Sequence, residues 1–460
     1  MSEDLQTKAE PTERTSLTVD EIREGLDSTA KGGVKNSIKN CVTVFRSDPL
    51  FKDAIKHNIL TERTDIVKPL GWQRLSGTLT DTDMPYILLY LEDNYGLTNE
   101  KKIESALRII ANENQYHPIR DYLNGLVWDG QERIRYALHR FLGADTDDFT
   151  YECLRLFMMG AIRRVFKPGC KFELMLCLVG GQGAGKSTFF RFLSVRDEWF
   201  SDDLKKLDDE NVYRKLQGHW IIEMSEMIAT ANAKSIEEIK SFISRQKETY
   251  KVPYEVHPAD RLRQNVFGGT TNKQDFLPRD RTGNRRFLPI RVYPERAEVH
   301  ILEDEDAARA YIDQMWAEAM SIYRSGDYAM KLTPEAERHL REYQKDFMQE
   351  DTQAGLIYDF LDTYKGDRVC SKQLYREALN HQFNEPADWE TRAICEIMNT
   401  GIESGAITGW QPFNGPRRFE GYGKQKGWER TGNENDESGN RDLCEQINFR
   451  EITGDDDVPF

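Results

Sequence analysis

Residues 180–187 constrain the fold of this chain more than any other segment, because they satisfy the pattern G-x-x-x-x-G-K-[ST]. They follow the apolar stretch 172–179, which is typical of a buried central strand, and precede the helical stretch 188–193. In this context, glycines let backbone N–H groups and a helix N-terminus face a polyphosphate. The sequence therefore predicts an α/β P-loop NTPase core; the alternative is a glycine-rich turn with a surface lysine.

The predicted ligands of this loop are ATP and Mg²⁺. Lys186 is expected to reach the terminal phosphates, and the Ser187 hydroxyl is expected to complete the magnesium shell. The nucleotide-binding residues are predicted to be Gly180, Gly181, Gln182, Gly183, Ala184, Gly185, Lys186, Ser187 and Thr188.

Residues 220–226 form a second candidate element, an apolar run that ends in two carboxylates, Glu223 and Glu226. An NTP hydrolase of this type needs an acidic residue on a neighbouring strand to hold magnesium and orient water. Glu223 is the better magnesium ligand because it ends the run directly, and Glu226 is expected to polarise water or support the metal. An acidic residue after a short strand is also common without any function.

Residues 265–272 and 261–291 supply further candidates. Asn272 ends an apolar run and is placed to meet the γ-phosphate and the attacking water, although Asn is also a favoured turn residue. Residues 261–291 hold eight basic and two acidic side chains. Among them, Arg285 and Arg286 are candidates for an arginine finger, with nucleic-acid contact or a solvated basic face as alternatives.

Tyrosines alternate with basic residues between the acidic pair and Asn272. Such a pattern suits single-stranded nucleic acid, because rings stack on bases and cations contact phosphates. It predicts a hairpin that binds DNA through Lys251, Tyr254, Arg261 and Arg263. A structural edge strand is the competing interpretation.

Composition and length set the surroundings of this core. The chain has 460 residues, a net charge of −15 and seven scattered cysteines without a CxxC pair, which indicates a globular cytoplasmic protein of about three units with no membrane segment. We expect a flexible lead (1–30), a mostly helical N-terminal domain (31–167) and the ATPase domain with a helical extension (168–350). A small helical C-terminal module that also fits a winged helix (351–430) and an acidic tail (431–460) would follow.

The ordered motifs resemble the virulence-associated protein E family of phages and mobile islands, whose ATPase core is similar to superfamily 3 or AAA+-type helicases. The resemblance rests on YHPIRDYL at 116–123, WDG at 128–130, the phosphate loop, EMSE at 223–226, TTN at 270–272, TGNRRFLPI at 282–290 and QMWAEA at 314–319. It implies Walker A roles for Lys186 and Ser187, Walker B roles for the two glutamates and a sensor role for Asn272. The glutamates are not adjacent here, which departs from the family pattern.

The resemblance implies an ATP-hydrolysing DNA helicase or translocase that replicates a phage or mobile element. Such a protein would act as a homo-oligomeric ring, a hexamer, on single-stranded or forked DNA, together with other replication proteins. Two alternatives stay open. One is an ATP-binding oligomeric interaction protein that captures a host or replication partner without unwinding DNA, and the other is a small-molecule kinase.

Overall fold

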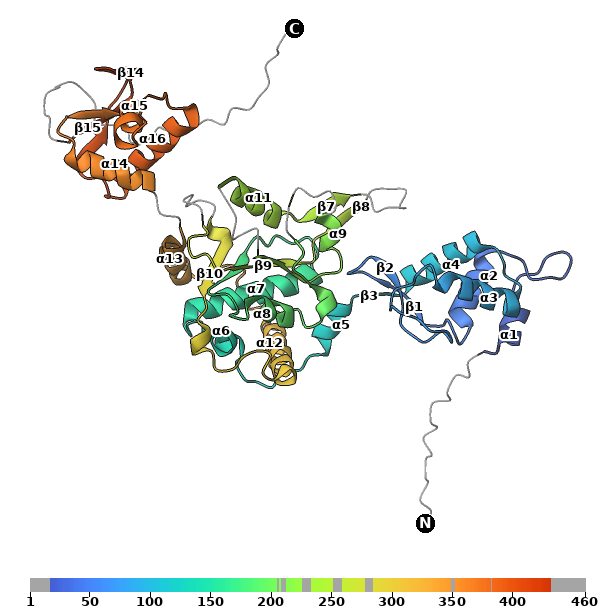
Figure 1. Ribbon diagram of the computed structural model, residues 1–460. Helices are drawn as coiled ribbons and strands as arrows, with labels where there is room; N and C mark the ends of the chain where they lie inside the picture. Colours follow the sequence, from blue (N-terminus) through green and yellow to red (C-terminus); the bar gives the residue numbers. More distant parts are fainter. Residues whose placement is uncertain are drawn as a thin grey trace, which may run out of the picture. The chain divides into compact units, whose positions relative to one another are not determined.

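The structure is a computed structural model of the chain. It describes residues 17–204, 207, 212–225, 233–250, 259–277, 284–348, 352–381 and 383–431. The chain divides into two compact units, Met1–Gln349 and Glu350–Phe460 (Figure 1).

The first unit begins with a helical segment built around its own apolar core. Its elements are α1 (Val19–Glu24), α2 (Ile38–Ser47), β1 (Ile55–Asn58), β2 (Arg63–Ile66), α3 (Asp83–Tyr95), α4 (Glu100–Glu113) and β3 (Gln115–Tyr116). Side chains of Ser37 and Asn99 cap α2 and α4. Ile22 and Leu26 are buried in this core, so residues 17–30 are folded, and the expected flexible lead does not extend over them.

The next three helices belong to the central core and not to the N-terminal one. They are α5 (Pro118–Gly125), α6 (Ile134–Leu142) and α7 (Asp148–Phe166). Their buried side chains, such as Leu138 and Phe157, pack against strands of the central sheet. The expected border at residue 167 therefore falls within one continuous core, because the apolar faces of these helices are covered by the sheet.

The central sheet has five parallel strands in the order β10-β4-β9-β6-β5. They are β4 (Met175–Val179), β5 (Phe200–Ser201), β6 (Ile221–Met224), β9 (Val266–Thr271) and β10 (Phe287–Arg291). The surrounding elements are α8 (Lys186–Leu193), α9 (Val212–Leu216), α11 (Ala233–Ser244), α12 (Glu305–Ser325), α13 (Pro334–Tyr343) and an antiparallel ribbon of β7 (Lys247–Tyr250) and β8 (Ala259–Leu262). This arrangement confirms the predicted α/β core.

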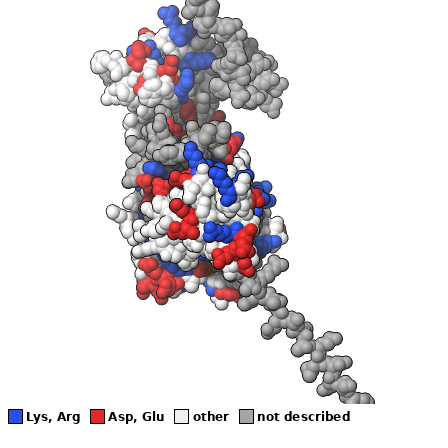
Figure 2. Space-filling model, turned by 90° about the vertical axis from the view of Figure 1, so that its right-hand side faces the viewer, with Lys and Arg blue, Asp and Glu red and all other residues white. Residues whose placement is uncertain are grey.

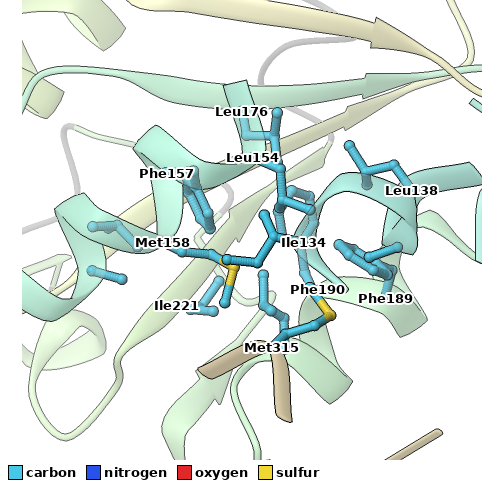
Figure 3. Close-up of a cluster of buried hydrophobic side chains, with 14 of the residues drawn as sticks. Ile134, Leu138, Leu154, Phe157, Met158, Leu176, Phe189, Phe190, Ile221 and Met315 are labelled. Atoms are coloured by element: carbon cyan, nitrogen blue, oxygen red, sulfur yellow. The ribbon is translucent and has the colours of Figure 1, made fainter. Parts of the chain in front are cut away.

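Strand β4 is apolar throughout because both faces of the sheet are covered. Leu176 and Leu178 pack on one face with side chains of α7, α8 and α12, as Figure 3 shows for Leu176. Met175, Cys177 and Val179 point to the other face, where side chains of α9 and α11 lie. Side chains alternate along a strand, so a continuous apolar run is what a strand with two covered faces requires.

The second unit has a separate core and a mixed topology. It contains α14 (Thr352–Thr363), β11 (Arg368–Cys370), α15 (Ser371–Gln373) with a following π-helical turn (Leu374–Ala378), α16 (Asp388–Glu403), β12 (Trp410–Pro412), β13 (Arg417–Phe419), β14 (Gly423–Gln425) and β15 (Gly427–Arg430). Strands β11, β15 and β12 form one sheet in that order, and β13 pairs with β14 in a separate ribbon. The predicted small C-terminal module thus combines helices and strands, with β11 between α14 and α15 and the other strands after α16.

The described surface carries charges of both signs. On the face drawn in Figure 2, acidic and basic side chains are interspersed. Within the described ranges, no helix is both long and apolar enough to cross a membrane.

Candidate functional site

The glycine-rich loop joins the carboxyl end of β4 to the N-terminus of α8. Gly183 and Gly185 have φ values of +79° and +76°, in the left-handed region that favours glycine. At Gly180, a Cβ atom would lie 2.6 Å from the carbonyl oxygen of Val292, so only glycine fits between the loop and the chain that follows β10. These glycines expose the backbone of the loop at the start of a helix, where the helix dipole favours an anion.

Lys186 is buried at the centre of this loop. Its Nζ donates hydrogen bonds to the carbonyl oxygens of Gly180 (2.8 Å) and Gly181 (2.6 Å) and to Oδ1 of Asn272 (2.9 Å). Burial lowers the pKa of Lys186, and nearby Glu223 partly opposes this effect. Asn272 follows the end of β9, the strand next to β4. Lys186 and Asn272, two predicted site residues that lie far apart in the sequence, are therefore in direct contact.

Glu223 lies on β6 and faces Ser187. The Ser187 hydroxyl donates to Oε1 of Glu223 at 2.7 Å, and the Thr270 hydroxyl donates to the same oxygen. The second oxygen, Oε2, is buried and has no hydrogen-bond partner among the described residues. Burial raises the pKa of this carboxyl, although both hydroxyl donors oppose the shift.

Ser187 and Glu223 fit a magnesium ion. Mg²⁺ prefers oxygen ligands and is commonly held by one or two carboxylates together with substrate phosphates and water. A buried carboxylate oxygen without a partner is costly unless a cation or a donor satisfies it. Thr270 was not predicted; a hydroxyl within an apolar strand is easily taken for an ordinary strand residue.

The substitution Glu223→Gln is expected to stabilise the metal-free protein. Because the folded-state pKa is raised, the ionised carboxylate opposes folding at neutral pH, and this cost disappears as the pH falls below about 4.3, the pKa of an exposed Glu. The variant should therefore melt at a higher temperature than the wild type at pH 7 with chelator present.

The matched control is Glu248→Gln, which neutralises another buried carboxylate. Glu248 forms an ion pair with the buried Arg263, and breaking such a pair leaves an uncompensated charge. This variant should melt at a lower temperature than the wild type. A lower melting temperature for Glu223→Gln at pH 7 would contradict the assigned environment of Glu223.

A cavity of about 530 Å³ opens beside the loop. Its walls are Gln182, Gly183, Ala184, Gly185, Lys186, Ser187, Thr188, Ser225, Thr270, Thr271, Asn272, His300 and Leu302. His300 and Leu302 come from the segment after β10 and are exposed. No motif marks them in the sequence, and they were not predicted. They give the polar phosphate loop an aromatic and an aliphatic neighbour.

Arg285 and Arg286 lie at the amino-terminal ends of the strands, opposite the end that carries the glycine-rich loop. They precede β10, whose first residue Phe287 pairs with Met175 at the start of β4, whereas the phosphate loop follows Val179 at the other end. The strand separates the two places by roughly 15 Å. Arg286 donates to Ser244 and lies 3.6 Å from Glu173. The structure therefore does not bring these arginines to the loop of the same chain.

The residues predicted to bind DNA occupy different environments. Arg261 on β8 pairs with Glu62 at 2.6 Å. Arg263 is buried, pairs with Glu248 and lies 4.4 Å from the ring centre of Phe242. This position does not fit DNA contact, because the guanidinium is enclosed by protein groups. Lys251, Tyr254 and Glu226 lie outside the described residues.

The fold and this cluster define a class: an α/β protein with a central parallel sheet and a glycine-rich loop between the carboxyl end of one strand and a helix N-terminus. Residues 123–349 match the family model of the virulence-associated protein E-like domain. The match confirms the resemblance seen in the motifs.

Other comparisons gave more distant similarities. One apo structure of the NrS-1 C-terminal region is 15% identical, with a TM-score of 0.39, and the alignment covers 82% of this chain and 96% of that chain. The A form of that region is 14% identical, with a TM-score of 0.40 and the same coverage. None of the curated proteins matches this sequence.

Proposed function

We propose that this chain is an ATP-dependent DNA helicase or translocase that acts as a ring, a hexamer, in the replication of a phage or mobile element. The observation that supports it best is the contact set of Lys186 with Asn272 and of Ser187 with Glu223. Four residues from three separate stretches of the sequence meet at one edge of the sheet. ATP would bind there with Mg²⁺ held by Ser187 and Glu223.

Each group has a definite task in hydrolysis. The backbone of the loop and Lys186 would bind and neutralise the β- and γ-phosphates, as in other loops of this pattern. Asn272, already bonded to Lys186, would orient the γ-phosphate and the attacking water. His300 and Leu302, which also line the cavity, would contact the base or ribose.

Strand β9 explains how the cluster is assembled. It lies between β4 and β6 in the sheet, so its carboxyl end carries Thr270 and Asn272 between the phosphate loop and the acidic strand. Thr270 then bonds Glu223, and Asn272 bonds Lys186. One strand thus links Lys186, the proposed phosphate contact, to Glu223, the proposed metal ligand. This link favours a hydrolase over a protein that merely binds nucleotide.

ATP hydrolysis by the purified chain is expected to rise several-fold when single-stranded DNA is added, because DNA in a ring would order neighbouring subunits around each nucleotide. Phosphate release with and without a single-stranded oligonucleotide measures this effect. An equal amount of duplex of the same sequence is the control. A rate that single strands leave unchanged would argue for the ATP-binding interaction protein, and phosphate transfer to a small acceptor would identify a kinase.

A further inference from the structure

The ribbon β13–β14 of the second unit carries two cations directly opposite each other. In its antiparallel register, Arg418 pairs with Lys424. Like charges directly opposite each other destabilise a strand pair. The pair therefore weakens the ribbon that carries it, which is expected of residues that serve a ligand and not the fold.

The cations on and beside the ribbon differ in whether they form ion pairs within the protein. Arg417 pairs with Glu429 at 2.7 Å and lies over the ring of Phe413, so it belongs to the unit's own packing. Arg418, Lys424 and Lys426 are exposed, and within the described ranges no carboxylate lies within ion-pair distance of them. These three residues present unneutralised positive charge to solvent.

Helix α16 of the same unit has the opposite sign. It carries four acidic residues and one basic residue, Arg392, whereas residues 417–426 carry four basic residues and one acidic residue. Asp388, Glu396 and Glu403 are exposed on the helix. A polyanion would be repelled by this helix and attracted by the ribbon, so the two elements cannot serve the same partner.

We propose that the ribbon β13–β14 binds the phosphate backbone of duplex DNA through Arg418 and Lys424, together with Lys426, which directly follows β14. A two-stranded ribbon fits the major groove of B-form DNA. The ribbon is also held in place: Phe419 stacks on Phe413, and the hydroxyl of Tyr422 donates to Glu377 at 2.5 Å. A fixed ribbon loses little conformational freedom when it binds.

The aromatic residues of the ribbon favour a duplex over a single strand. Single-strand sites combine cations with exposed rings on which bases stack. Here Phe413 is buried and Phe419 is half-buried against it, so the ribbon offers charge without a free stacking surface. Such a contact recognises phosphates and carries no base sequence information.

The test compares two charge reversals in the full-length chain. The double variant Arg418→Glu/Lys424→Glu keeps a like-charged pair in the ribbon, so the cross-strand repulsion is matched, and Arg392→Glu on α16 is the control. Binding to a fluorescent duplex of arbitrary sequence is measured without nucleotide between 50 and 200 mM salt. We expect the double variant to bind at least about 10-fold more weakly and to lose about 1.8 from the slope of log affinity against log salt, since each phosphate contact contributes about 0.9.

Several results would overturn the proposal: no duplex binding by the wild type, unchanged binding by the double variant, or an equal loss in Arg392→Glu. Loss of single-strand binding alone would also overturn it. A third variant, Arg418→Gln/Lys424→Gln, removes the charge without reversing it and should give an intermediate loss. The proposal is independent of ATP hydrolysis, because duplex binding is measured without nucleotide.

Discussion

Lys186→Ala is expected to lower ATP hydrolysis by roughly 10²–10³-fold, the loss seen when one preorganised donor to a developing charge is removed. In the free protein the ammonium is held by two loop carbonyls and Asn272, so its position is set before nucleotide arrives. Steady-state phosphate release at saturating ATP and Mg²⁺ measures the loss.

Two features make this substitution interpretable. Burial lowers the pKa of Lys186, which means that its positive charge opposes folding at neutral pH. Removal of the ammonium therefore removes an unfavourable buried charge. Lys101→Ala, on the exposed surface of α4, is the matched control and should hydrolyse ATP at the wild-type rate. Unchanged hydrolysis in Lys186→Ala would place the active site elsewhere.

Replacement of both Arg285 and Arg286 by alanine is expected to lower hydrolysis by about 10³-fold, as for other arginine fingers, while ATP binding persists. Both residues lie at the sheet edge away from the loop of their own chain, so a catalytic contact requires the nucleotide of another copy. They also line a second cleft, together with the cations Lys171, Lys331 and Arg341. Arg108→Ala on α4 is the matched surface control.

Mixing the two variants distinguishes arginines that act on a neighbouring subunit from arginines whose loss damages their own subunit. Lys186→Ala lacks a working loop but keeps its arginines, and the arginine double variant has the reverse defect. In a ring of heterologous contacts assembled from equal amounts, about a quarter of the interfaces would join a working loop to a working arginine. Hydrolysis should then reappear in the mixture. If the mixture stays as inactive as its two components, the arginines do not act across an interface.

The local motifs could be predicted from the sequence because their physics is local. A buried strand, a tight glycine loop and a helix N-terminus follow one another within about twenty residues, and the pattern of residues 172–193 reflects all three. Glu223 and Asn272 were predicted as site residues because each ends an apolar run. The contact of Asn272 with Lys186 agrees with that expectation.

Predictions failed where burial depends on distant partners. Arg263 lies in a basic run, which suggests a solvated surface, yet it is enclosed by Glu248 and the ring of Phe242. Helices α5 to α7 have the same helical apolar periodicity as the helices before them, but their apolar faces are covered by the sheet. His300 was missed because nothing in its neighbourhood shows that the chain returns to the phosphate loop.

Under the proposed function, ATP hydrolysis at this loop drives DNA unwinding. Strand displacement from a forked duplex, measured with and without ATP for the wild type and Lys186→Ala, tests it most directly. The proposal predicts displacement by the wild type only when ATP is present, and none by Lys186→Ala. If the wild type hydrolyses ATP but leaves the fork intact, the chain is not a helicase.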